Sequence, residues 1–482
     1  MHFGGTLNPE TLETQIAIIG GGGAGLAAAV AAAEKGADII LLEKARTLGG
    51  NSVRAEGLFA AESPAQRRMK IDARRDELFK VAMDYSHWKI NPRIVRAFMD
   101  KSGDTIQWLE EKGVAFNVYP LYPNQVPLVW HCPKRRGVEI IEVLSKNCED
   151  FGVRLFCETG AKEIVTPDKK GMTGVLATKK GEEIRITARS VIIATGGYAG
   201  NKGLLRKYCP YYSENLVCAG LLHRGDGLLM ATKIGAATEG LGILQLSGHA
   251  IPGAPREVRV VAEEPNTIWV NKKGERFIDE AAAFIHWESV NAVVRQPDSV
   301  SYTLLDERIK QDFIESGVIK GGGLSMVPGT KLVGLGEELQ LAVDEEKVKI
   351  SNSWDEIARW MGATPEALRT TIDEYNSFCD QGYDEILAKD RRYLVALRTP
   401  PYYAIKCYPR FLGTIGGIKI NHSMEVLDYE DNAIPGLYAA GVDTGGWESD
   451  TYCALLAGST FGFAINSGRI AGENAVKYGL GK

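Results

Sequence analysis

The sequence predicts an α/β fold that opens with a strand, a glycine turn, a helix and a second strand. Residues 16–43 read IAIIGGGGAGLAAAVAAAEKGADIILLE, so two apolar runs flank a glycine run and an alanine-rich stretch. A second buried strand is expected at 190–198, and the C-terminal segment supplies further strands and a helix beginning near Gly458. Strands that alternate with helices are typical of a parallel sheet covered by helices.

The glycines of the first unit have the spacing of a dinucleotide-binding motif. Gly20 permits the tight turn, Gly22 lets the backbone approach a pyrophosphate, and Gly25 lets the helix pack closely on the strand. Glu43 follows about twenty residues later, where a carboxylate can bond the hydroxyls of a ribose. The helix N-terminus would face the phosphates with its positive dipole end. This unit therefore predicts a dinucleotide site.

The composition is that of a globular enzyme with two to three domains. The chain has 482 residues, of which 45% are apolar and 24% charged. Its net charge of −5 argues against nucleic acid or an anionic membrane as a general partner. The N-terminus lacks a signal-peptide pattern, and no apolar stretch reaches about eighteen residues without charge. We expect a cytoplasmic protein that does not insert into a membrane.

The eight cysteines are scattered and form no CxxC, CxxCH or cysteine–histidine cluster with ligand spacing. This pattern predicts no iron–sulfur cluster, haem c, zinc site or reactive dithiol in the chain, and hence no metal site.

The order of predicted elements divides the chain into three segments. Residues 1–240 form the first part of a nucleotide-binding domain, with a β-meander inserted at about 153–193. Residues 241–411 lose the regular alternation of strand and helix and form a separate α+β unit. Residues 412–482 return to the first domain. Between them, 64–111 is predicted as a largely helical stretch.

An ordered set of motifs makes the chain similar to a known superfamily. It resembles the FAD-dependent fumarate reductases, succinate dehydrogenase flavoproteins and 3-ketosteroid dehydrogenases over nearly its whole length. The resemblance implies FAD, a Rossmann-like FAD-binding domain made from both ends of the chain, and a capping domain over the isoalloxazine. The motifs are GGGGAGL, LLEK, LGGNS, VIIATGGY, GDGLLMA, VNKKGERFIDE, PPYYAIK, TIGGIKI, GLYAAGVDTGG and GRIAGENA.

The resemblance also implies which residues contact the FAD. At Ser459 and Thr460 the C-terminal helix would point its N-terminus at the flavin pyrimidine, where the helix dipole stabilises negative charge. Many relatives bind FAD covalently through a histidine after the ribose acid, but no histidine lies between His2 and His87, so we expect noncovalent FAD. The predicted FAD contacts are Gly20, Gly22, Gly25, Glu43, Lys44, Gly49, Gly50, Asn51, Ser52, Gly57, Ala161, Thr195, Gly196, Asp226, Gly441, Asp443, Ser459 and Thr460.

Three positions depart from the fumarate reductase pattern. Phe284 stands at the proton-donor arginine, Gly413 at a carboxylate-binding histidine, and Leu455 at a carboxylate-clamping arginine. An unpaired carboxylate costs several kcal/mol to desolvate, so a dicarboxylate would have too few partners here. The chain is therefore predicted not to use fumarate or succinate, and its pocket suits a ring or an aryl or alkyl enone.

Four residues near these positions are candidates for the remaining chemistry. Saturating a C=C bond requires a hydride site, a proton donor and a group that holds the developing enolate oxygen. Tyr452 and His249 are candidate proton donors, with an aromatic packed on the flavin edge and a satisfied structural histidine as the alternatives. His286 is a further candidate that could face away. Arg410 can orient a carboxylate or carbonyl, or be an exposed surface arginine.

The sequence predicts an FAD-dependent oxidoreductase of the CH–CH group, with hydride transfer between flavin N5 and an activated C=C bond of an enoate, enone or cyclic ketone. An FAD oxidase or hydroxylase is a second hypothesis, although no second GxGxxG follows a strand to bind NAD(P)H. A flavin-binding electron-transfer subunit is a third. The expected partners are a small-molecule substrate and a separate electron donor or acceptor.

Overall fold

A computed structural model describes residues 10–165, 173–321 and 326–479 and divides the chain into two compact units. Unit 1 comprises 1–209, 220–244 and 413–482, and unit 2 comprises 210–219 and 245–412. Both contain helices packed on sheets, so the prediction of a mixed α/β fold is confirmed.

The centre of unit 1 is an eight-stranded sheet whose inner strands are parallel. Its main path has the order β18-β19-β9-β1-β2-β6, and β8 joins it by pairing with β9. The strands are β1 (Glu10–Ile19), β2 (Ile39–Leu42), β6 (Arg154–Phe156), β7 (Thr159–Val165), β8 (Thr173–Lys179), β9 (Glu182–Ile193), β18 (Glu425–Leu427) and β19 (Ala433–Ala439).

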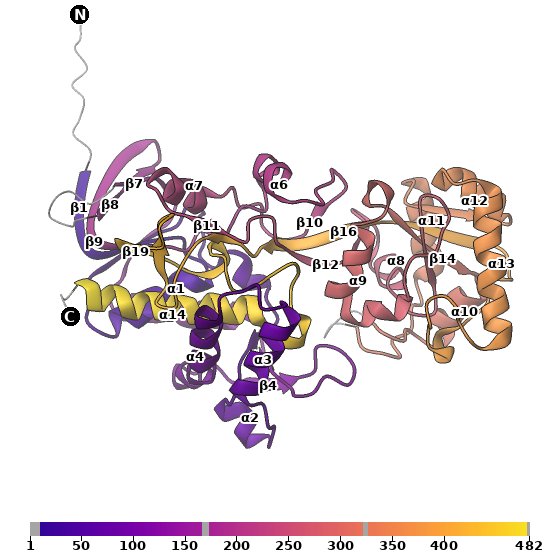
Figure 1. Cartoon of the computed structure of the whole chain (residues 1–482), viewed down its shortest axis with the longest axis horizontal. Helices are drawn as coiled ribbons and strands as arrows, with labels where there is room; N and C mark the ends of the chain where they lie inside the picture. The colour runs from indigo at the N-terminus through magenta and orange to yellow at the C-terminus, as the bar shows by residue number, and fades with distance from the viewer. Residues whose placement is uncertain (1–9, 166–172, 322–325, 480–482) are drawn as a thin grey trace, which may run out of the picture. The chain divides into compact units, whose positions relative to one another are not determined.

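Two helices pack closely beside this sheet. Every residue of α1 (Gly23–Ala33) is buried, as its alanine-rich sequence requires. The long C-terminal helix α14 (Ser459–Gly479) lies alongside α1 (Figure 1). A Cβ at Gly468 would lie 2.2 Å from Ala24 O, and one at Gly472 would lie 2.4 Å from Ala28 O. Glycine at these positions therefore lets the two helix backbones approach each other.

The inserted strands form an antiparallel meander. β7 pairs with β8, and β8 pairs with β9, which is itself parallel to β1 and β19. Because β9 belongs to both arrangements, it links the meander to the parallel sheet.

The stretch predicted as largely helical contains three helices. Pro92 begins α4, and the Asn91 side chain caps that helix by accepting from Arg93 N and Ile94 N. Unit 1 also contains a three-stranded sheet. Its strands are β3 (Leu58–Phe59), β5 (Trp130–Pro133) and β4 (Phe116–Tyr119). The remaining helices and strands of unit 1 are α2 (Pro64–Arg68), α3 (Arg75–Tyr85), α4 (Pro92–Glu111), α5 (Gly137–Asp150), α6 (Lys202–Tyr208), α7 (Asp226–Lys233), β11 (Thr238–Glu239) and β17 (Gly417–Ile418).

Unit 2 is built on a six-stranded sheet with β16 at its centre. Antiparallel β14 and β15 pair with β16, and β10 runs parallel to it. The strands are β10 (Val217–Cys218), β12 (Leu244–Ala250), β13 (Ile268–Asn271), β14 (Ser301–Asp306), β15 (Val348–Ser351) and β16 (Tyr402–Thr414).

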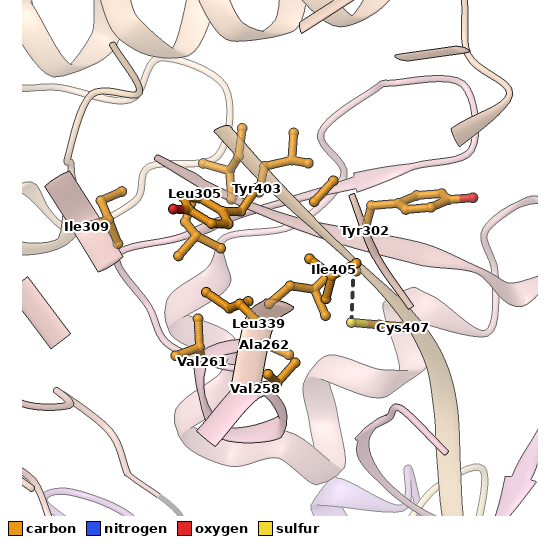
Figure 2. Packing of buried hydrophobic residues seen from close by; sticks show 14 of the residues in the cluster. Val258, Val261, Ala262, Tyr302, Leu305, Ile309, Leu339, Tyr403, Ile405 and Cys407 are labelled. Carbon is orange, nitrogen blue, oxygen red and sulfur yellow. Dashed lines mark hydrogen bonds between the residues drawn. The ribbon is translucent and has the colours of Figure 1, made fainter. Parts of the chain in front are cut away.

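Helices cover the unit 2 sheet and close one apolar core. Figure 2 shows part of it, where side chains of β14 and β16 meet those of α8 and α11. The helices are α8 (Arg256–Val261), α9 (His286–Val293), α10 (Glu307–Glu315), α11 (Leu335–Asp344), α12 (Trp354–Met361) and α13 (Pro365–Gln381).

A buried ion network stabilises the turn after β13. Arg276 donates to both Glu280 oxygens at 2.8 Å and to Asp384 at 2.6 Å. Lys389 Nζ donates to Glu280 at 2.9 Å, and both of these side chains are fully buried. Every charge in the group therefore has a partner of opposite sign, as buried charges require.

Within the described ranges, no helix is long and apolar enough to cross a membrane. The same residues contain no group of three or more histidine, cysteine, aspartate or glutamate side chains that could hold a metal ion.

Candidate functional site

In the first glycine turn of unit 1, a side chain would clash at two of the glycines but not at a third. Gly20 has φ +108°, and a Cβ there would lie 2.2 Å from Ala194 O. At Gly25 a Cβ would lie 1.9 Å from Gly20 O, whereas at Gly22 the nearest atom would be Gly49 O at 3.9 Å. Gly20 and Gly25 therefore allow the chain to turn and pack, and Gly22 leaves its backbone approachable.

A second glycine loop lies against the first. Gly49 pairs with Gly22 in an isolated parallel bridge, and a Cβ on Gly50 would lie 3.6 Å from Gly22 Cα. Ser52 Oγ accepts from Gly23 N at 3.2 Å, at the start of α1. The structure therefore brings two segments about thirty residues apart to one helix N-terminus, which is suited to hold phosphate.

Glu43 lies at the end of β2 and holds both neighbouring turns. Its Oε2 accepts from Gly21 N and its Oε1 from Ala45 N, each at 2.7 Å. A carboxylate has about four acceptor positions, so these two bonds leave capacity for ribose hydroxyls. Beside it, Lys44 forms an ion pair of 2.6 Å with Asp226, the first residue of α7.

Asp443 is a buried brace for the turn after β9. Its carboxylate accepts from the backbone N–H groups of Thr195, Gly196 and Gly197 and from the Thr195 hydroxyl. The Asp443 side chain has no exposed edge to offer a ligand, because the residue is 1% exposed. Its observed contacts are structural, and the glycine turn that it holds could face the cofactor.

The other predicted cofactor contacts lie around the same loops. Asn51 Oδ1 accepts from Leu221 N at 2.7 Å. Gly57 packs so tightly that a Cβ would lie 2.6 Å from His131 O, and Gly441, with φ +68°, lies next to α1 at Ala24. Ala161 lies in β7.

The N-terminus of α14 has polar groups directed at it from a buried loop. Gly458, with φ +81°, donates its N–H to the Tyr452 hydroxyl at 3.1 Å. Ser459 begins the helix and is buried. In the described part of the chain, Thr460 Oγ1 has no hydrogen-bond partner although the atom is buried. A buried hydroxyl without a partner is costly, so this helix end fits a ligand that accepts hydrogen bonds.

Tyr452 is 2% exposed, and burial raises the pKa of its hydroxyl well above the usual value. The hydroxyl is already the acceptor for Gly458 N. In this structure Tyr452 thus shapes the loop that leads into α14.

In unit 2, Glu263 interacts with three of the four predicted catalytic residues. It accepts from His249 N at 2.6 Å and pairs with Lys320 Nζ at 2.8 Å. His286 and Arg410 also interact electrostatically with its carboxylate. Burial by itself would raise the pKa of Glu263, but these neighbours hold it below its usual range, so the carboxylate is ionised at neutral pH.

The two histidines of this cluster are neutral at pH 7. Burial lowers the pKa of His249 to about 4 and that of His286 to about 3. His249 Nδ1 lies 3.1 Å from Ala262 O, which can only accept, so Nδ1 carries the proton and Nε2 accepts from Ser301 Oγ at 3.3 Å. His286 begins α9 and stacks on Trp287 with a ring separation of 3.7 Å. Both nitrogens of His249 are thus engaged within unit 2.

Arg410 lies near the end of β16 and is half-buried. Its Nε donates to Ser247 O at 2.6 Å, which fixes the direction of the guanidinium. That bond uses one of the five N–H groups of an arginine, so the terminal nitrogens retain donor capacity.

The comparison of this chain with protein families gives one decisive result. The model of the FAD binding domain family matches residues 15–455. The chain belongs to this FAD-binding family. The predicted recognition of the fumarate reductase and dehydrogenase superfamily is confirmed, as is FAD as the cofactor of the family.

Relatives in the FAD-binding family include several reductases. The chain is 32% identical to a vinyl phenol reductase of Lactiplantibacillus plantarum, with 96% of each chain covered. It is 29% identical to a urocanate reductase of Eggerthella lenta over 97% of this chain and 75% of the relative. A solved flavocytochrome c3 fumarate reductase in an open conformation has a TM-score of 0.76 at 27% identity, covering 97% of this chain and 79% of that one. An FAD-dependent reductase or dehydrogenase of the C=C class is therefore confirmed as the reaction class.

The positions that differ from the fumarate reductase pattern carry no charge in this member of the FAD-binding family. Phe284 contacts Tyr393 with a ring separation of 5.7 Å. A Cβ at Gly413 would meet no atom within 4 Å, so the position borders open space. Leu455 is half-buried in the loop before α14.

Two functional candidates were not predicted from the sequence. Glu263 is the first of two adjacent glutamates after α8, and Glu448 lies in the loop WESD; both sequences look like exposed loop acids. Both residues are in fact less than a tenth exposed. The residues around them come from distant segments, so no local pattern could have identified them.

Proposed function

We propose that the protein is a reductase for an alkene conjugated to an aromatic ring or a carbonyl group, with noncovalent FAD in unit 1 and unit 2 as its cap. The substrate class is inferred from Phe284, Gly413 and Leu455, which carry no charge at positions where fumarate reductases have charged residues. These side chains cannot pair with the two carboxylates of a dianion, and desolvating an unpaired carboxylate costs several kcal/mol. An aryl or enone substrate carries no such charge.

The vinyl phenol reductase relative favours an aryl alkene within that class, because it is 32% identical over almost the whole of both chains. Phe284 adds an aromatic face, and aromatic pairs contribute about 0.5–1.5 kcal/mol beyond the area they bury. Gly413 has no side chain, and the space beside it, where a Cβ would meet no atom within 4 Å, could hold a ring.

Unit 1 offers a cradle for each part of FAD, which supplies hydride at N5 when bound and reduced. The backbone at Gly22 and Gly50 would hold the pyrophosphate at the N-terminus of α1. Glu43 has spare acceptor capacity for the ribose hydroxyls. The orphaned Thr460 hydroxyl and the first N–H groups of α14 would receive the pyrimidine oxygen.

Unit 2 offers the groups that would act on the substrate. Arg410 would hold the substrate oxygen with its terminal nitrogens, since its Nε is already fixed on Ser247. Charge that develops on that oxygen is stabilised by a preorganised donor. Of the two histidines, His286 is favoured over His249 to face the substrate, because both ring nitrogens of His249 are engaged. As a neutral imidazole, His286 would hold the substrate by a hydrogen bond. The Tyr452 hydroxyl, engaged by Gly458, is assigned to shaping the loop.

A separate protein or small molecule would deliver the electrons. The chain has no CxxC or CxxCH motif for a further redox centre. No histidine stands in the loop after Glu43 to bond the flavin, which supports noncovalent FAD.

The test is a substrate panel with purified protein. Denaturation should release FAD into the supernatant, and anaerobic turnover with a reduced viologen should be at least tenfold faster for hydroxylated styrenes or aryl enones than for fumarate. Release of no flavin, or turnover of fumarate alone, would refute the proposal. Rapid reoxidation by O₂ with substrate-linked peroxide would favour an oxidase, and redox cycling only with protein partners would favour an electron carrier.

A further inference from the structure

The loop before α14 contains an acid that the proposed reaction does not use. Glu448 is 6% exposed and lies beside the first residue of α14, because Ser459 Oγ donates to Glu448 Oε1 at 3.4 Å. The Cys453 backbone N–H also donates to it. The carboxyl is therefore held at the helix end proposed to receive the flavin pyrimidine.

The surroundings of Glu448 are apolar. It lines a small pocket together with Phe98 and Met99 of α4 and with Ile90, which lies between α3 and α4. The preceding residue, Trp447, is stacked on Phe463 of α14 with ring centroids 4.3 Å apart. These contacts keep the carboxyl from water.

Among the described residues, none with a positive charge is found to act on the Glu448 carboxyl. In the part of the chain that the structure describes, the groups that interact with its carboxyl are Cys453 N and Ser459. The titratable residues of the same loop that face it are Tyr452 and Cys453. The pocket residues contributed by α3 and α4 carry no charge.

Burial without a cation favours the protonated acid. It raises the pKa of Glu448 from its ordinary value of 4.5 to about 8. At neutral pH the carboxyl is therefore uncharged, and above about pH 8 it is ionised.

We infer that the Glu448 carboxylate, where it is ionised, takes up a proton when FAD at the N-terminus of α14 is reduced, so that electron and proton uptake are coupled there. This inference rests on the flavin site proposed above. Reduction adds negative charge to the flavin, and a second negative charge nearby is costly in a medium of low dielectric constant. Coupling is reciprocal, so protonation of Glu448 also favours reduction of the flavin.

The step balances as two protons for two electrons. An external reductant would give two electrons to the flavin, and solvent would give it one proton, which leaves the reduced flavin with one negative charge. Solvent would supply the second proton, which binds a Glu448 oxygen. No bond of the substrate is involved, and reoxidation of the flavin returns the Glu448 proton to solvent. Glu448 is thus a positioning residue that sets the charge at the flavin.

An anaerobic potentiometric titration of the full-length FAD-loaded protein tests this inference. Dithionite and mediator dyes would give the midpoint potential of the flavin at intervals from pH 6.5 to pH 9.5. Above about pH 8 the wild type should take up one more proton per two electrons than Glu448→Gln. Identical pH dependence in the two proteins would overturn the inference.

Glu473→Gln is the matched control, since it removes a carboxylate from α14 about 21 Å from Ser459 along the helix. It should follow the wild type. If Glu448→Gln does not fold, an infrared difference spectrum of the wild type at pH 9 should gain a protonated-carboxyl band on reduction, and absence of that band would refute the inference. Protein that binds no FAD would refute the proposed function, whereas protein that reduces alkenes without this coupling would refute the inference alone.

Discussion

At Gly22 and Gly25 the same residue type meets opposite surroundings. A side chain at Gly25 would overlap Gly20 O, whereas one at Gly22 would project into space with Gly49 O 3.9 Å away. The spacing of the sequence motif assigned packing to one and ligand approach to the other, and the local geometry agrees with both assignments.

The contrast gives a paired prediction. Gly25→Ala should destabilise the protein by about 2 kcal/mol or more, because the helix must move off the strand to relieve the overlap. Gly22→Ala should leave thermal stability without FAD nearly unchanged and weaken FAD binding at least tenfold. Thermal melts of FAD-free protein and a fluorescence titration with FAD measure the two effects. Equal FAD affinity in Gly22→Ala and wild type would contradict the proposed pyrophosphate site.

Arg410 is the residue on which the proposed chemistry in unit 2 most depends. Arg410→Lys should lower kcat/KM for the best aryl alkene by about 10²-fold, since a lysine cannot keep both the Ser247 bond and a donor on the substrate. Arg398→Lys changes an arginine of unit 2 that pairs with Asp380 and is 53% exposed, and it should have no effect. Steady-state kinetics with a reduced viologen compare them, and equal activity of the two variants would remove Arg410 from the mechanism.

Individual site residues could be proposed from the sequence only where a motif or the family resemblance marks them. Glu43 was proposed from its spacing to the glycines and Ser459 from the resemblance, and their contact with FAD stays a prediction. Glu263 and Glu448 were not predictable, because their burial depends on residues far away in sequence. The sequence left two interpretations of His249, as a proton donor or as a structural histidine. Its two ring hydrogen bonds agree with the structural interpretation.

At the scale of elements, the strand–helix–strand unit was predictable because apolar runs form the end of β1, all of β2 and most of α1. β1 and β2 pair with Ile16 opposite Ile39, and α1 between them is wholly buried. The stretch 64–111 was predicted as largely helical and contains α2, α3 and α4, and Asn91 and Pro92 mark the start of α4. The segment TIWVNKKGERFID, residues 267–279, has a strand-like sequence, but β13 ends at Asn271 in a turn that the ion network of Arg276 holds.

The turn after β9 should depend on one side chain from another element. Asp443→Asn places an NH₂ donor against backbone N–H groups and should cost about 2–3 kcal/mol. Asp431→Asn removes only a partner of Lys419 at a site 65% exposed, and it should change stability by less than about 1 kcal/mol. Urea unfolding distinguishes the two variants, and similar midpoints for both would show that Asp443 is not a brace.

β12 and α9 should lose stability in acid. Burial lowers the pKa of His249 to about 4 and of His286 to about 3, so the stability that the neutral imidazoles confer is complete above about pH 6.5. It is lost as pH falls through the folded pKa values, since the unfolded chain then binds more protons. Hydrogen exchange corrected for intrinsic rate should show reduced protection of β12 and α9 at pH 4.5 relative to pH 7.5, but unchanged protection of α1. Equal changes in all three would contradict the assignment.

For the whole molecule, the sequence indicated an α/β flavoprotein and its reaction class because the motifs are spread along the chain in order. The family model spans residues 15–455, which covers both units. Only the class of substrate could be predicted. The prediction rests on the absence of charge at Phe284, Gly413 and Leu455 and not on a residue that would recognise one particular substrate. The proposed function therefore joins the cofactor cradle of unit 1 to a substrate site in which Phe284, Gly413 and Leu455 offer no charge to a dicarboxylate.

The most direct test of this account is stopped-flow reoxidation of the reduced, FAD-loaded protein under anaerobic conditions. Mixing with a hydroxylated styrene or an aryl enone should reoxidise the flavin and yield the saturated product, at a rate at least tenfold above that with fumarate at equal concentration. Faster reoxidation by fumarate, or no reoxidation by any conjugated alkene, would contradict the central claim.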